Sequence, residues 1–150
     1  MTIARVYYAP FENLTFGGTA DRNFWEIKAP ADRQIILHGF SVTSDYTTDE
    51  RARLVMKRFS TDGTGTAVTE VKANSDNSLT SEATVIHTVT PGTAGDILAA
   101  WRWSQQGELL WLPTPEMRVV IPAGSRVGLN LAAALGAARA WSGWLCWEEL

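Results

Sequence analysis

The amino-acid sequence predicts one all-β sandwich of jelly-roll type, preceded by an extended N-terminal arm. Three observations support this prediction. Apolar residues alternate with polar ones in several short segments, as in strands with one buried face. Proline and glycine separate these segments. The length of 150 residues fits one domain, which at this size buries roughly 68–70% of its unfolded surface and needs no disulfide or metal to build a core.

The stretch from residue 108 to 131 shows the pattern most clearly. Its three apolar runs are separated by Pro113-Thr114-Pro115 and Pro122-Ala123-Gly124, and proline cannot donate to a sheet ladder. Residues 119–121 are apolar and β-branched, which is typical of a strand buried on both faces. In residues 127–131 every second residue is apolar, which predicts one buried face. We expect a tight turn at Pro122-Ala123-Gly124 and a strand on each side of it.

The remaining elements follow from the same signals, taken in order along the chain. Residues 3–8 could form a first strand, and the mixed polarity, Pro10 and the glycines of residues 9–23 indicate an irregular segment. Together, residues 1–23 are assigned to an extended N-terminal arm. The domain then spans residues 24–150. Its other expected strands cover residues 24–27, 34–42, 51–59, 83–89, 96–105, 109–112 and 141–149. Residues 60–82 are polar and are expected to form a long loop, which is usually functional or mobile in a compact domain.

Composition narrows the classes of function. The formal net charge is −3, which provides no basic footprint for nucleic acid or for an anionic membrane. The single cysteine, Cys146, allows no internal disulfide. No apolar run approaches the roughly 18–20 residues that span a bilayer. We therefore expect neither nucleic acid nor membrane as a partner.

The residues that often carry chemistry form no recognisable constellation. His38 and His87 both lie inside apolar strands, without a neighbouring ligand at metal-binding spacing. Cys146 alternates with Leu145 and Trp147, which favours a buried or interface position over a nucleophile. The sequence predicts no enzyme, no metal and no cofactor.

Tryptophan is the one unusual component, with seven in the chain. Trp101 and Trp103 share a strand face, and Trp144 and Trp147 lie on opposite faces of the last strand. Three interpretations remain open: a strand buried on both faces, a protein–protein contact, or a platform that stacks on sugar rings.

Four short motifs carry a resemblance to a known family, which extends over most of residues 24–150. They are Phe24-Trp25-Glu26-Ile27-Lys28-Ala29-Pro30-Ala31-Asp32, Leu112-Pro113-Thr114-Pro115-Glu116, Pro122-Ala123-Gly124-Ser125-Arg126, and Trp141-Ser142-Gly143 with Glu148-Glu149. The chain resembles small jelly-roll proteins encoded among the head genes of tailed phages and prophages, similar to decoration (cement) proteins. Residues 1–23 are longer than the family pattern, and residues 60–82 differ from it. The family supplies no catalytic residue.

The resemblance implies a virion protein that is made in the host bacterial cytoplasm and binds the outer phage head as a homotrimer, with the major capsid protein as its partner. An apolar patch at Trp144 and Cys146, near the alanine-rich segment that contains Leu135, is the candidate trimer interface, because a monomer would rarely expose it.

Capsid binding is assigned to the arm or to residues 60–82, with the apolar anchors Tyr7, Tyr8, Phe11 and Phe16 as candidates. The alternative for the arm is that it pairs along the domain's own sheet. The alternative function is a carbohydrate-binding module, which requires an exposed, flat tryptophan.

Overall fold

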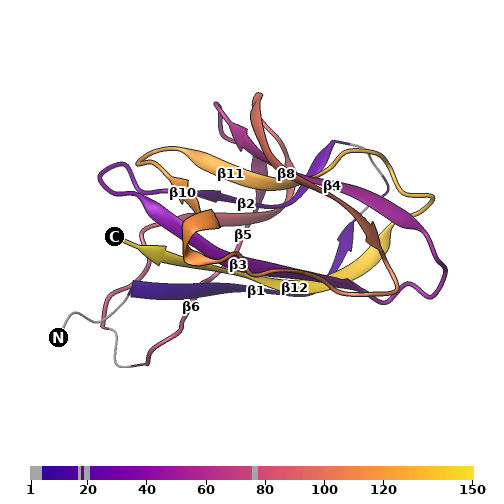
Figure 1. Ribbon diagram of the computed structural model, residues 1–150, viewed down its shortest axis with the longest axis horizontal. Coiled ribbons are helices and arrows are strands. Elements are labelled where there is room, and N and C mark those ends of the chain that lie inside the picture. Colours follow the sequence, from indigo (N-terminus) through magenta and orange to yellow (C-terminus); the bar gives the residue numbers. More distant parts are fainter. Residues whose placement is uncertain (1–4, 17, 19–20, 76–77) are drawn as a thin grey trace.

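Two antiparallel β-sheets pack face to face in the computed structural model of the chain, which describes residues 5–16, 18, 21–75 and 78–150. Figure 1 shows the sheets edge-on as two layers. Sheet A contains β6 (Val71–Lys72), β1 (Arg5–Phe16), β12 (Arg139–Glu149), β3 (Ile35–Ser44), β9 (Leu109–Trp111) and β10 (Val119–Ile121). Sheet B contains β5 (Thr64–Ala67), β7 (Thr84–Thr90), β2 (Arg22–Lys28), β11 (Arg126–Leu131), β4 (Arg51–Phe59) and β8 (Ala94–Ser104). The prediction of an all-β sandwich is confirmed.

The strand pairing is nested from the ends of the chain inward. β1 pairs with β12, and β2 pairs with β11. β3 pairs with both β9 and β10, which act as one strand interrupted by the 3-10 helix η1 (Pro115–Met117), and β4 pairs with β8. In addition, β12 pairs with β3 and β11 pairs with β4, which joins these pairs into two sheets. This order is the jelly roll, so the predicted topology is also confirmed.

Aromatic rings fill the space between the sheets. Trp25 from sheet B meets Phe40 from sheet A at a centroid distance of 5.5 Å, and Phe24 meets Trp141 at 4.9 Å. All four side chains are buried, with Leu129 from the centre of sheet B. Edge-to-face aromatic pairs add to the apolar burial that holds a sandwich together.

Residues 5–16 are strand β1 of sheet A, which confirms the described part of the strand expected at residues 3–8 and corrects the irregular segment expected from residue 9. Tyr7, Phe11 and Phe16 have exposed fractions of 0%, 3% and 5% and lie in the core. Phe11 packs on Trp141 with ring centroids 5.0 Å apart, and Phe16 stacks on Phe24 at 3.9 Å. The alternative expectation for the arm, that it pairs along the domain's own sheet, is confirmed for residues 5–16. No boundary at residue 23 therefore separates this strand from the domain, while residues 1–4, 17, 19 and 20 of the predicted arm lie outside the described residues.

Two features of β1 explain why its sequence resembles an arm. Pro10 interrupts the strand pattern, but its side chain is exposed on the outer face. A β-bulge shifts the register between Phe11 and Leu14, where Asn13 has a φ of 50° and its N–H donates to Ser142 Oγ at 2.9 Å. The bulge breaks the period of two that identifies strands in a sequence.

Residues 60–82 do not form one long loop, so that prediction is wrong. β5 pairs with β7 and extends sheet B, and β6 pairs with β1 and extends sheet A. β5 and β8 lie at opposite ends of the strand order of sheet B, and β6 lies in sheet A. Residues 76 and 77 lie outside the described residues.

The predicted turn between β10 and β11 is confirmed. Gly124 has a φ of 70°, and the N–H of Ser125 donates to the carbonyl of Pro122 at 2.9 Å. One detail of this stretch is wrong: β10 is not buried on both faces. It is an edge strand that pairs with β3, and Val120 is 40% exposed.

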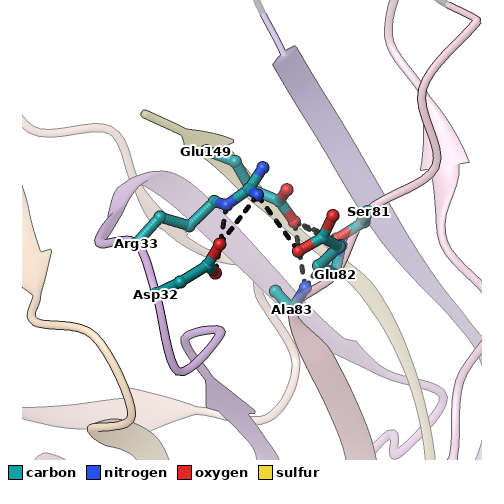
Figure 2. A network of polar contacts seen from close by, with 6 residues as sticks. All are labelled: Asp32, Arg33, Ser81, Glu82, Ala83 and Glu149. Atoms are coloured by element: carbon teal, nitrogen blue, oxygen red, sulfur yellow. Dashed lines mark hydrogen bonds and ion pairs between the residues drawn. The ribbon is translucent and has the colours of Figure 1, made fainter.

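A buried carboxylate fixes the end of β12 to the segment before β7, as Figure 2 shows. Glu149 is 3% exposed, and its Oε1 accepts hydrogen bonds from the backbone N–H groups of Glu82 (2.9 Å) and Ala83 (3.0 Å) and from the hydroxyl of Ser81. Arg33 lies beside this group, between Asp32 (3.1 Å) and Glu82 (3.2 Å). Charge-assisted hydrogen bonds of this kind are about twice as strong as neutral ones.

Candidate interaction surfaces

The outer face of sheet A presents one aromatic pair. Tyr8 on β1 is 39% exposed and meets the partly buried Trp144 on β12 edge-on, with ring centroids 6.0 Å apart. Tyr8 lies opposite Cys146 in the strand register, and Pro10 lies opposite Trp144. Of the four predicted capsid anchors, Tyr8 is therefore the one that the structure leaves accessible.

Cys146 points to this outer face but is only 5% exposed. Burial raises the pKa of its thiol, and the neighbouring Cys146 is the main cause of the raised pKa of Tyr8. A thiol whose pKa is raised stays protonated near neutral pH and is a poor nucleophile. Cys146 is thus a small buried residue rather than an exposed part of a patch.

Leu135 does not join Trp144 and Cys146, which corrects the predicted trimer interface. It lies between β11 and β12, has an exposed fraction of 9% and belongs to the core cluster. There it lines the same small cavity as Phe16 and Trp103. The alanine-rich segment around it turns this one large apolar side chain inward.

The two histidines have different partners. His38 Nε2 lies 3.0 Å from Glu148 Oε2 on the outer side of sheet A, where both side chains are partly exposed. His87 Nδ1 lies 2.8 Å from Thr88 Oγ1, and burial lowers the pKa of this imidazole. Neither histidine lines the cavity described below.

The seven tryptophans are all described. Trp25, Trp103, Trp141 and Trp147 are buried, and Trp101, Trp111 and Trp144 are partly buried. The carbohydrate hypothesis needs a ring with an exposed flat face, and the folded chain offers none at full exposure. It remains an untested alternative, which a fluorescence titration with a panel of glycans would examine.

Four exposed apolar side chains lie on β9, on β10 and on the connection between them. Their exposed fractions are 48% for Leu110, 63% for Leu112, 72% for Met117 and 40% for Val120. We call these four residues the β9–β10 strip. Both strands pair with β3, so the connection that contains Pro113 and Pro115 must pass over the edge of sheet A. Sequence analysis missed the strip because it assigned these residues to strands within the sandwich.

Gly39 on β3 makes this crossing possible. A Cβ atom at this position would lie 2.5 Å from the carbonyl oxygen of Trp111 and 2.8 Å from Leu112 Cδ2. The lack of a Cβ at Gly39 therefore lets the backbone of Trp111 and the side chain of Leu112 lie directly against β3.

A polar cavity of about 290 Å³ lies on the other side of the molecule, beside β2. It is lined by Glu26, Lys28, Asp62, Gly63, Thr84 and Ile86. Glu26 is 3% exposed, and its carboxylate accepts from Asn23 Nδ2 at 3.2 Å and from the N–H of Gly63 at 3.1 Å. Asp62 bridges Arg126 at 2.8 Å and Lys28 at 3.0 Å. The arrangement ties the segment after β4 to the outer face of sheet B.

The sequence did not predict this cluster, because the alternating pattern of residues 127–131 predicts that only one face of β11 is buried. Arg126, Gly128 and Asn130 are all buried. Asn130 Nδ2 donates to Asn23 Oδ1 at 2.9 Å, which continues the hydrogen bonds from Glu26. A glutamate inside an otherwise apolar strand at residues 24–27 was the one available signal.

Burial raises the pKa of Glu26, and the negative charge on Asp62 adds to this effect. The hydrogen bonds from Gly63 and Asn23 and the positive charge on Arg126 lower the pKa but do not cancel the rise. The folded state therefore binds a proton more tightly than the unfolded chain, so the ionised form costs stability. The quantity to compare is the free energy of unfolding of the wild type minus that of Glu26→Gln. We expect this difference to be largest below the usual glutamate pKa and to fall as the pH rises through the raised pKa of Glu26. Urea unfolding of both proteins at several pH values between about 4 and 7 measures this. A difference that is constant across the range would contradict it.

Comparisons with known proteins add no relative to this description. No family model, curated protein or solved structure matches the chain. In the described part of the chain, no helix is long and apolar enough to cross a membrane, and no group of three or more acidic, histidine or cysteine side chains is placed to hold a metal ion.

Proposed function

We propose that this chain is a capsid decoration protein, a structural protein that binds the outside of a phage head as a homotrimer and stabilises it. Its partner is the major capsid protein, and it is made in the bacterial cytoplasm before it joins the virion. The proposal is supported by the resemblance of its turn motifs and by the jelly-roll fold. The observation that carries it is the β9–β10 strip, because an exposed apolar patch is typical of a site for a protein partner.

The strip takes the place of the interface predicted from sequence. Four apolar side chains within one short segment, each exposed by 40% or more, resemble the apolar core of an interface rather than scattered surface residues. β3 pairs with both β9 and β10, and Gly39 leaves room for the start of the connection between them. A cyclic trimer buries one such patch per subunit without open-ended polymerisation.

A charge in the strip is expected to dissociate the trimer. We predict that Met117→Glu and Leu112→Glu each change the mass measured by light scattering at micromolar concentration from trimer to monomer, because the interface would bury an unpaired carboxylate. Val71→Glu is the matched control, since Val71 is 54% exposed but lies on β6, outside the strip. A wild-type protein that is already monomeric would remove the trimer from the proposal.

Binding to the capsid is tested separately with undecorated phage heads. We expect the wild type to co-sediment with heads and saturate a fixed number of sites, and its trimeric state to strengthen weak contacts by multivalency. Tyr8→Ala is expected to weaken this binding, since Tyr8 is the one predicted capsid anchor whose side chain is exposed. A wild-type protein that does not bind heads would contradict the decoration proposal.

A further inference from the structure

Strand β8 forms the last strand of sheet B. Among the described strands it pairs with β4 alone, so its other edge presents unpaired backbone groups. Two register shifts disturb its first half, opposite Met56, Lys57 and Phe59. From Ala99 to Ser104 the strand pairs regularly with β4. A regular open edge is a template for another strand, and proteins usually protect such edges.

The inner side of this edge is apolar and incompletely covered. Trp101 lies opposite Leu54 in the register and so points between the sheets, yet it is only partly buried. The ring of Trp101 meets the ring of Phe40 edge-on, with centroids 5.5 Å apart. Trp111 from sheet A also contacts the ring of Phe40, at a centroid distance of 5.7 Å. The two partly buried tryptophans thus line the side of the sandwich between β8 and β9.

The outer side of the same edge carries uncompensated positive charge. Arg102 on β8 lies directly opposite Arg53 on β4, and Arg51 follows on the same face. All three side chains are exposed, and none makes an ion pair or side-chain hydrogen bond with a described residue. Like charges directly opposite each other destabilise a sheet.

This charge arrangement is unexpected in a chain with 16 acidic and 13 basic residues. A carboxylate at either position would pair with the other and stabilise the sheet, yet both are arginine. No described residue of the folded chain neutralises the arginine pair. A partner that supplies negative charge would do so.

We propose that the β8 edge binds an extended segment of another protein in which acidic residues alternate with apolar ones. Such a segment adds a strand to sheet B and satisfies the open backbone groups between Ala99 and Ser104. Because side chains alternate between the two faces of a strand, its carboxylates lie beside Arg102, with Arg53 one strand further away, while its apolar side chains cover Trp101. Each property of the partner matches one feature of β8. Its extended backbone matches the open edge, its apolar residues match the inner side, and its acidic residues match the basic outer side.

Two other occupants fit the surface less well. A second copy of β8 would bring another arginine to an edge that already carries an uncompensated pair. A phosphate polymer would neutralise the arginines but would leave the backbone edge and Trp101 uncovered. The inference also goes beyond the proposed function, because it concerns β8 and not the β9–β10 strip, and it holds for whichever protein carries the segment.

The probe is a heptapeptide of alternating glutamate and valine with blocked ends, added to the full chain. We expect it to bind and to slow hydrogen exchange of alternate amides between Ala99 and Ser104. Arg102→Glu is expected to weaken the binding by about tenfold or more, because it loses a close charge pair and adds a repulsive charge. Arg53→Glu is expected to weaken it less, because Arg53 lies one strand further from the edge. Lys72→Glu, on the distant strand β6, makes the same change of charge and should leave binding unchanged.

Four results would overturn the inference. The first is no binding of the peptide at millimolar concentration. The second is equal binding of a lysine–valine heptapeptide. The third is binding without protection of the β8 amides, which would mean electrostatic contact without strand addition. The fourth is tighter binding of a single-stranded DNA oligonucleotide that is lost in the same arginine variants. Because all four use peptides or oligonucleotides and no phage heads, they are independent of the capsid assay.

Discussion

The Phe11→Ala variant is expected to lose about 3–5 kcal/mol of unfolding free energy, as measured by urea denaturation. Phe11 is 3% exposed and packs on Trp141 across a centroid distance of 5.0 Å, so its removal leaves a cavity in the centre of the sandwich. If residues 5–16 were a free arm, the same substitution would leave stability unchanged. The experiment therefore decides whether β1 is a structural strand or a capsid-binding segment.

Tyr8→Ala in the same strand is the matched control. Tyr8 is 39% exposed, so its removal is expected to cost less than about 1 kcal/mol. A Phe11→Ala protein with wild-type stability and impaired binding to heads would reverse the assignment. The position of β1 also means that deletion of residues 1–16 would remove a strand of sheet A and would unfold the protein, so single substitutions are the better test.

The second large effect is expected at Glu149. Glu149→Ala should lower the free energy of unfolding by roughly 2–4 kcal/mol, because three donors at Ser81, Glu82 and Ala83 lose their shared acceptor. In a chain of 150 residues this corresponds to a fall in Tm of roughly 4–16 °C. Glu149→Gln keeps an oxygen acceptor and should cost less than the alanine variant.

Glu148→Ala provides the comparison for Glu149. Glu148 is the adjacent residue, is partly exposed and contacts His38, so its loss is expected to cost no more than about 1 kcal/mol. Equal effects of the two substitutions would show that the network in Figure 2 does not fix the end of β12.

The strands could be predicted where their neighbours in the sheets left a clear period of two. Residues 126–131 are an example, because Val127, Leu129 and Leu131 alternate with Arg126, Gly128 and Asn130, and Pro122 and Gly124 mark the approach. β1 was predicted only in part, since the bulge at Asn13 interrupts the alternation and Pro10 is a residue that usually ends strands. The period identifies strands with one buried face and regular pairing, and it fails where backbone geometry changes within a strand.

The surfaces were harder to predict than the strands. Alternation shows which residues leave the core face, but it does not show what then covers them. Cys146 and Asn130 both point outward, yet Cys146 is 5% exposed and Asn130 is fully buried. The contacts that cover them come from distant parts of the chain, and no local pattern records them. The same limit explains why Leu135 was assigned to an interface and Met117 was not.

The nested strand order also affects how the chain can fold. β12 lies between β1 and β3, and β11 lies between β2 and β4, so both sheets lack a central strand until residues 126–149 are available. Almost every pairing then joins distant parts of the chain, and topologies of this kind fold slowly, on a timescale of about milliseconds to seconds. A growing chain would meanwhile expose strand edges and apolar faces that lead to aggregation. Yield in the cell should therefore depend on how long the last two strands take to arrive, as well as on the stability of the finished sandwich.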